Sequence, residues 1–134
     1  MTNHKCLGLL EKQKKTEAAE IVSYAQKISD LMLGKKALDV IIIDVQKITT
    51  LTDFFVICTS ESEPQTRAIT DHIHEQMKAN GMKAWHIEGY ENLDWVLLDY
   101  VNIVVHVFSR ESRSYYDLEH LWGDGQITQV HDKK

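Results

Sequence analysis

The sequence predicts a single α/β domain in which helices flank a mixed five-stranded sheet. Two apolar runs, residues 95–100 and 103–108, are separated by only two residues, which suits a hairpin turn between antiparallel strands. Two earlier runs, residues 38–45 and 54–59, are rich in β-branched and aromatic residues, as buried strands are. Apolar residues recur at helical spacing before, between and after these runs. The expected order is therefore helix, two strands, helix, three strands, helix.

Length and composition fit one domain. The chain has 134 residues, of which 43% are hydrophobic and 26% charged, as in an ordinary globular protein. We expect residues 1–15 to form a flexible leader, residues 16–124 the α/β domain, and residues 125–134 a frayed tail. The apolar runs are far shorter than the roughly 20 residues of a membrane helix, and the N-terminus lacks the apolar core of a signal peptide. These features predict a cytoplasmic protein.

The first helix is expected to begin at Thr16 and end at Gly34, since threonine caps helix starts and glycine caps helix ends. Its buried stripe recurs at steps of three and four residues and consists of Ala18, Ile21, Val22, Ala25, Ile28 and Met32. Residues 38–45 then form a central strand, residues 47–53 a threonine-rich loop, and residues 54–59 a second strand. The helix should pack on the sheet through this one stripe.

The second helix has a capping box at its start. Ser62 precedes Gln65 by three residues, and Pro64, the only proline, suits the first helical turn. The helix should end near Gly81, and residues 82–88 read as a third strand. A strand, a helix and a strand in succession predict a right-handed crossover between parallel neighbours.

The hairpin at residues 95–108 is expected at the centre of the sheet. Alternation puts Trp95, Leu97 and Asp99 on one face of its first strand, opposite Val96, Leu98 and Tyr100. Both faces are largely apolar, which favours a strand that is covered on both sides. A final helix should follow from a cap at Ser109 to about Leu121. We expect its inward side chains to be Tyr115, Leu118 and Trp122.

The histidines and cysteines do not have the spacing of a metal site. His72 and His74 are two residues apart on a predicted helix and so lie on different sides of it, and neither HExxH nor CxxC occurs. We expect Cys58 to pack in the core and His106 to be a core histidine bonded to a neighbour. The six glycines are dispersed and form no phosphate loop. The sequence therefore predicts no cofactor and no metal.

The sequence offers candidate residues for two other classes of function. Asp39, Asp44 and Asp53 border the first two strands, and three such acids could hold magnesium in a nucleotidyltransferase-like enzyme. Asp39 and Asp44, however, are five residues apart, at opposite ends and on opposite faces of one strand. An RNA-binding module would need a basic stripe, for which Lys35, Lys36 and the N-terminal lysines are the candidates.

Aromatic and acidic residues are concentrated in the last third of the chain. Tyrosine and tryptophan beside charge are typical of protein interfaces, because the ring buries area while its polar tip tolerates water. We divide these rings between core and interface, since a small domain cannot bury them all. The net charge of −5 disfavours bare nucleic acid as the main ligand and would attract a basic partner. The residues concerned are Tyr90, Trp95, Tyr100, Tyr115, Tyr116 and Trp122, interleaved with Asp94, Asp99, Asp117 and Glu119.

Seven segments in order resemble the ribosomal silencing factor family, also called the Iojap-related family. Together they span about residues 36–124, two-thirds of the chain. They are LDVIIIDV at Leu38, TDFFVI at Thr52, SxxQxxAI at Ser62, EGY at Glu88, WVLLDY at Trp95, VVHVF at Val104 and YYDLEHLWGD at Tyr115.

The resemblance implies a mixed five-stranded sheet of nucleotidyltransferase-like topology without known catalysis. It also implies binding to large-subunit ribosomal protein fourteen, which blocks joining of the small subunit and lowers translation when nutrients are short. A monomer or homodimer off the ribosome would be in keeping with the family. The partner-binding surface that we expect is acidic and aromatic, and consists of Tyr90, Trp95, Leu97, Asp99, Tyr100, Tyr116 and Glu119.

The hairpin turn departs from the family pattern. Family members usually have Gly then Asp between these two strands, where this chain has Val101 and Asn102. Tight turns favour residues that accept positive φ, which asparagine tolerates and valine does not. We therefore expect a turn of another type or a longer loop.

Overall fold

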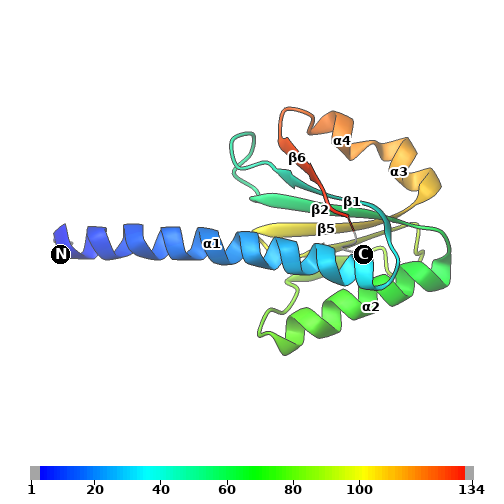
Figure 1. The fold of residues 1–134 in the computed structure, drawn as a ribbon, viewed down its shortest axis with the longest axis horizontal. Coiled ribbons are helices and arrows are strands. Elements are labelled where there is room, and N and C mark those ends of the chain that lie inside the picture. The colour runs from blue at the N-terminus through cyan, green and yellow to red at the C-terminus, as the bar shows by residue number, and fades with distance from the viewer. Residues whose placement is uncertain (1–3, 132–134) are drawn as a thin grey trace.

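A six-stranded mixed sheet forms the middle of the computed structural model, which describes residues 4–131 (Figure 1). The elements in chain order are α1 (His4–Gly34), β1 (Leu38–Asp44), β2 (Phe54–Ser60), α2 (Glu63–Ala79), β3 (His86–Glu88), β4 (Trp95–Asp99), β5 (Ile103–Ser109), α3 (Arg110–Tyr116), α4 (Leu118–Leu121) and β6 (Gln126–Gln129). The strands lie in the order β3-β4-β5-β2-β1-β6. Only β2 and β5 pair in parallel among the described strands, so the predicted mixed sheet is confirmed.

The described residues contain six strands where five were predicted, because part of the expected tail is a strand. β6 pairs antiparallel with β1, with Ile127 opposite Ile43 and Gln129 opposite Ile41. All four β6 side chains are exposed, so the strand is held mainly by its backbone ladder. Such a strand needs no apolar run, which is why the sequence pattern did not reveal it.

The predicted pairing of the second and third strands is wrong. β3 is only three residues long and pairs antiparallel with β4 at the sheet edge, while the parallel neighbour of β2 is β5. The chain therefore leaves β2, forms α2, and passes through β3 and β4 before it returns beside β2 as β5. Residues 82–85, predicted as part of the third strand, lie outside it.

Helices cover both faces of the sheet, as predicted (Figure 1). α1 and α2 lie on one face, where Ile28, Met32, Ile69 and Ile73 pack on the strands. α3 and α4 lie on the other, where Leu118 is the buried helical residue. The alternate side chains of β2 enter these two cores, with Val56 and Cys58 on the first and Phe55 and Ile57 on the second.

α1 begins at His4, so residues 4–15 are helical where a flexible leader was predicted. Lysine, glutamate, glutamine and leucine dominate this segment, and all are good helix formers even without a regular apolar stripe. The helix projects beyond the sheet at its N-terminal end (Figure 1). The division of the chain into leader, domain and tail stays a prediction.

The predicted cap of α2 at Ser62 is confirmed, although the return bond from Gln65 goes to the residue before the cap. Ser62 Oγ accepts a hydrogen bond from the Gln65 N–H at 3.2 Å, and Gln65 Oε1 accepts one from the Glu61 N–H at 2.7 Å. Asn80 caps the end of the helix, and Gly81 follows with a φ of 83°. These local signals fix where α2 starts and stops.

The predicted final helix is interrupted. Ser109 caps it as expected, with Oγ accepting the Ser112 N–H at 3.2 Å, but Asp117 has a left-handed φ of 46° and separates α3 from α4. Tyr115, near the end of α3, is 82% exposed, so its predicted inward orientation is wrong. Leu118 is buried and Trp122 is half-buried against Phe55, as predicted.

Val101 carries the backbone strain of the β4–β5 turn. Its φ is 72°, and the Asn102 N–H donates to the Tyr100 carbonyl at 2.9 Å, the hydrogen bond of a γ-turn. Asp99 supports the turn, because its Oδ1 accepts the Val101 N–H at 2.7 Å. The connection between β4 and β5 spans residues 100–102 and is a turn of another type, as expected, with a β-branched residue in the region that such residues avoid.

Val101→Gly should stabilise the fold by about 1 kcal/mol. A left-handed φ costs an L-residue roughly 1–2 kcal/mol, and glycine avoids this cost at a smaller loss of backbone entropy. Urea unfolding monitored by circular dichroism should show a higher midpoint for the variant. Asn102→Gly is the matched control and should not stabilise, since Asn102 has no positive φ. A lower midpoint for Val101→Gly would contradict the strain.

Candidate docking surface

Three side chains of β4 lie on the sheet face that α3 and α4 only partly cover. Trp95, Leu97 and Asp99 share one face of β4, as the alternation of the strand predicted, but all three are half-buried where a strand covered on both sides was expected. α3 packs on β5 and β2, so it stops short of the outer part of the sheet. Tyr116, from the end of α3, reaches back over Trp95. We call Trp95, Leu97, Asp99 and Tyr116 the β4 face.

Trp95 is held by rings on several sides. Its ring centroid lies 4.9 Å from that of Phe108 and 4.5 Å from that of Tyr116, within the range of favourable aromatic pairs. Its indole N–H donates to His106 Nδ1 at 3.0 Å. The indole is thus fixed in orientation while part of it stays accessible.

His106 is the buried polar group beneath the β4 face. It lies opposite Leu97 in the β4–β5 ladder and stacks on Phe108. Because Nδ1 accepts from Trp95, the neutral ring carries its proton on Nε2. Burial lowers the pKa of His106 to about 3, so the ring is neutral at physiological pH. The prediction of a core histidine bonded to a neighbour is confirmed.

Asp99 and Tyr116 add a carboxylate and a second ring to the accessible part of the β4 face. Asp99 lies opposite Val104 on β5 and His86 on β3. Tyr116 is 47% exposed, and Tyr115 meets it edge-on at 5.0 Å between ring centroids. The surface therefore combines apolar rings with a carboxylate, and such a combination suits contact with a basic partner.

Three other residues of the expected partner-binding surface lie elsewhere. Tyr90 is 37% exposed but turns toward α2, where its hydroxyl donates to Asp71 Oδ1 at 2.8 Å and Arg67 lies over its ring. Tyr100 is buried in the core beneath α1 and α2, and this burial raises its pKa to about 12. The inward position of Tyr100 follows from the strand alternation that puts Asp99 outside.

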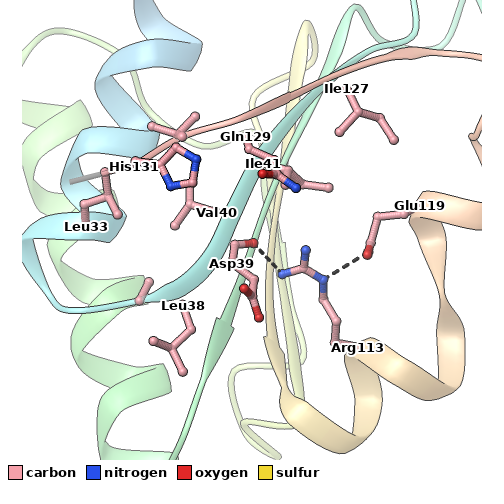
Figure 2. A pocket seen from close by; sticks show the side chains of 12 residues that line it. Leu33, Leu38, Asp39, Val40, Ile41, Arg113, Glu119, Ile127, Gln129 and His131 are labelled. Carbon is pink, nitrogen blue, oxygen red and sulfur yellow. Dashed lines mark hydrogen bonds and ion pairs between the residues drawn. The ribbon is translucent and has the colours of Figure 1, made fainter. Parts of the chain in front are cut away.

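Glu119 belongs to a clamp around Arg113 and not to the β4 face. Arg113 Nε donates to Glu119 Oε1 at 3.0 Å, while Nη1 donates to the Asp39 carbonyl at 2.8 Å and to Thr59 Oγ1 at 2.9 Å. Figure 2 shows the guanidinium between Asp39 and Glu119 at the edge of a cavity of about 600 Å³. These contacts tie the α3–α4 segment to β1 and β2.

The acids considered for a metal site do not converge. Asp39 and Asp44 occupy opposite ends of β1. Partial burial raises the pKa of Asp53, and the charge of Asp44 raises it further. Within residues 4–131 no group of three His, Cys, Asp or Glu side chains is arranged to hold a metal ion. Asp44 Oδ1 instead accepts the Gln46 N–H at 3.0 Å, the turn role expected for such residues.

Cys58 is buried in the core, as expected for a packing residue, and this burial raises its pKa to about 12. The side chain of Cys6 lies outside the described side chains.

Across the part of the chain that the structure describes, the helices are too short or too polar to cross a membrane.

Sequence reasoning missed a group of exposed apolar residues beyond one end of the β4 face. Leu51 and Trp85 are 84% and 78% exposed, and Val101 is also exposed. They come from three separate loops, so no periodicity connects them. The available signal was Trp85, a large aromatic residue that the pattern assigned to the third strand.

Comparison with known proteins gives one consistent result. The profile of the family described as "Ribosomal silencing factor during starvation" matches residues 16–134. The ribosomal silencing factor RsfS of Bacillus subtilis is 40% identical over 96 residues, covering 72% of this chain and 81% of that protein. The chloroplastic protein Iojap of Zea mays is 30% identical over 106 residues, covering 79% of this chain and 46% of that protein.

Solved structures agree with the sequence matches. A crystal structure of a Chromobacterium violaceum protein superposes with a TM-score of 0.72 at 31% identity, covering 85% of this chain and 92% of that one. A Bacillus halodurans protein gives a TM-score of 0.67 at 35% identity, covering 85% of this chain and 99% of that one. The fold described above is therefore shared with relatives of similar length.

The buried His106 should make the fold less stable in acid. Its folded pKa of about 3 lies below the ordinary 6.5, so the unfolded chain binds a proton that the folded chain excludes. The stability that the neutral His106 ring contributes is fully present above about pH 6.5. It is lost as the pH falls toward 3, at about 1.4 kcal/mol of unfolding free energy per pH unit. Urea unfolding at several pH values should show a steeper acid loss for the wild type than for His106→Gln. Parallel pH profiles would contradict the neutral buried ring.

Proposed function

The chain belongs to the ribosomal silencing factor family, and from this membership we propose that it represses translation by docking on the large ribosomal subunit. The contact is with large-subunit ribosomal protein fourteen, on the side that meets the small subunit. Once docked, the protein blocks joining of the two subunits by its bulk. The repression operates when nutrients are limited.

The single observation that supports this proposal, beyond membership, is the composition of the β4 face. Trp95 and Tyr116 provide rings of the kind that dominate interface energetics, and Asp99 provides negative charge beside them. Ribosomal proteins are typically basic, and this chain has a net charge of −5. The two surfaces are therefore complementary in charge.

Preorganisation strengthens such a contact. The hydrogen bond from Trp95 to His106 and the stacking on Phe108 fix the indole before a partner arrives. A ring that is already fixed loses little conformational entropy on binding. The β4 face thus has the properties of a rigid anchor for a protein partner.

Occlusion requires no chemistry from the protein. It needs a stable complex and enough volume at the junction between the subunits. The family description names silencing of ribosomes and no catalytic activity. Asp39 and Asp44, which a magnesium-dependent transferase would have to bring together, are at opposite ends of β1.

Tyr116→Ala should weaken binding to purified large subunits about tenfold or more, while Tyr90→Ala should leave it unchanged. Truncating an interface aromatic commonly costs more than 1.4 kcal/mol, the equivalent of tenfold in affinity. The two tyrosines are similarly exposed, but Tyr90 packs toward α2. Sedimentation of labelled protein with large subunits gives the affinities. Equal losses for both variants, or a loss for Tyr90→Ala alone, would exclude the β4 face as the contact.

Asp99→Asn should slow association at low salt and have a smaller effect at high salt. The amide keeps an oxygen that can accept the Val101 N–H, so the turn is retained while the charge is removed. Charge that steers a partner acts mainly on the association rate and is screened over about 8 Å at physiological ionic strength. Stopped-flow association across a salt series measures the effect. A change that does not vary with salt would rule out steering by Asp99.

A further inference from the structure

A groove of about 410 Å³ opens at the end of the sheet where the β4–β5 turn lies. Most of its lining is apolar or aromatic, and the charged residue among its lining is Asp99. We call it the end groove. It is lined by Thr49, Leu51, Thr52, Phe55, Trp85, Asp99, Val101, Val104 and Trp122.

Three large apolar side chains stand exposed around the end groove. They are Leu51 from the β1–β2 loop, Trp85 before β3, and Val101 in the turn, exposed by 84%, 78% and 55%. Single exposed apolar residues are ordinary, but a cluster drawn from three loops around one groove is typical of a binding surface.

The conformation of Val101 is a second, independent observation. Its positive φ places a β-branched residue in a strained turn at the groove wall, where glycine would relieve the strain. Strained residues of this kind cluster at ligand-binding and switch sites. Contact of the Val101 side chain with a ligand in the groove would offset this backbone cost.

The end groove adjoins the β4 face. Asp99 belongs to both, and Val104, opposite Asp99 in the β4–β5 ladder, lines the groove. A partner that covers Leu97 and Asp99 consequently also reaches the groove. Two indoles line the groove together with Asp99: the Trp85 backbone N–H donates to the Asp99 carbonyl at 2.7 Å, and Trp122 packs edge-on against Phe55.

We infer that the end groove holds a lysine or arginine side chain of the same basic ribosomal partner. This inference rests on the proposed function. The aliphatic stem packs on Leu51 and Val101, an indole face attracts the cation, and Asp99 supplies the opposite charge. Within residues 4–131, the cation–π contact that the chain itself forms joins Arg67 to Tyr90, away from the groove.

Variants of Trp85 and Val101 test the inference, with purified large subunits as the probe. Trp85→Leu should weaken binding about tenfold and Trp85→Phe less, because phenylalanine keeps an aromatic face for the cation while leucine keeps only apolar bulk. Val101→Gly should weaken binding several-fold although it stabilises the fold. A loss of affinity in a more stable protein cannot come from misfolding. Val22→Ala, an exposed apolar site on α1, is the control and should bind as the wild type does.

The outcomes separate this inference from the proposed function. If Tyr116→Ala weakens binding while the Trp85 and Val101 variants bind normally, the end groove is not part of the contact and the inference is overturned, but the proposed function stands. If Trp85→Leu alters only the oligomeric state, the groove belongs to a contact with a second copy of the chain. The inference is then overturned as well, and the proposed function stands. Equal losses for Trp85→Leu and Trp85→Phe would exclude a cation as the occupant. If the wild type does not bind large subunits, both proposals fail.

Discussion

Parallel pairing of β2 with β5 determines the path of the chain between them and the way in which the sheet is covered. Residues Phe54–Ser60 lie opposite Ile103–Ser109 along the full length of both strands. Parallel neighbours cannot be joined by a tight turn, so the chain between them has to travel far. It carries α2 across one face and forms β3 and β4 before returning. Both strands are thereby covered on two sides, which accounts for their nearly continuous apolar sequence.

The same arrangement creates the exposed surface. α3 starts directly after β5, so this short helix packs on β5 and β2 and leaves β4 half covered. Trp95 and Tyr116 pack together at this boundary, and His106 holds the indole from below. Core and surface are therefore continuous here: the outer atoms of rings that stabilise the sheet remain available to a partner. Asp99 adds charge at the edge of this apolar area.

Strong local sequence signals made several strands and the start of α2 predictable. The apolar runs predicted the strands β1, β2 and β5, and the cap at Ser62 predicted the start of α2. Alternation along β4 predicted that Trp95 and Asp99 share one face. β6 escaped prediction because backbone pairing with β1 needs no side-chain pattern. Two of the expected site residues lie away from the β4 face for different reasons. Alternation along β4 already puts Tyr100 on the opposite side from Asp99. The orientation of Tyr90 depends on Asp71, a neighbour in space that is distant in sequence.

Light scattering during association of purified ribosomal subunits shows whether the protein keeps the two subunits apart. An obstructing protein that acts by volume should lower the rate and extent of the scattering rise, in proportion to the fraction of large subunits that it occupies. Adding it to subunits that are already joined should have a much smaller effect, because the docking site is covered. Unchanged association at concentrations that saturate the large subunit would contradict the account, most clearly if the protein turned over a nucleotide instead.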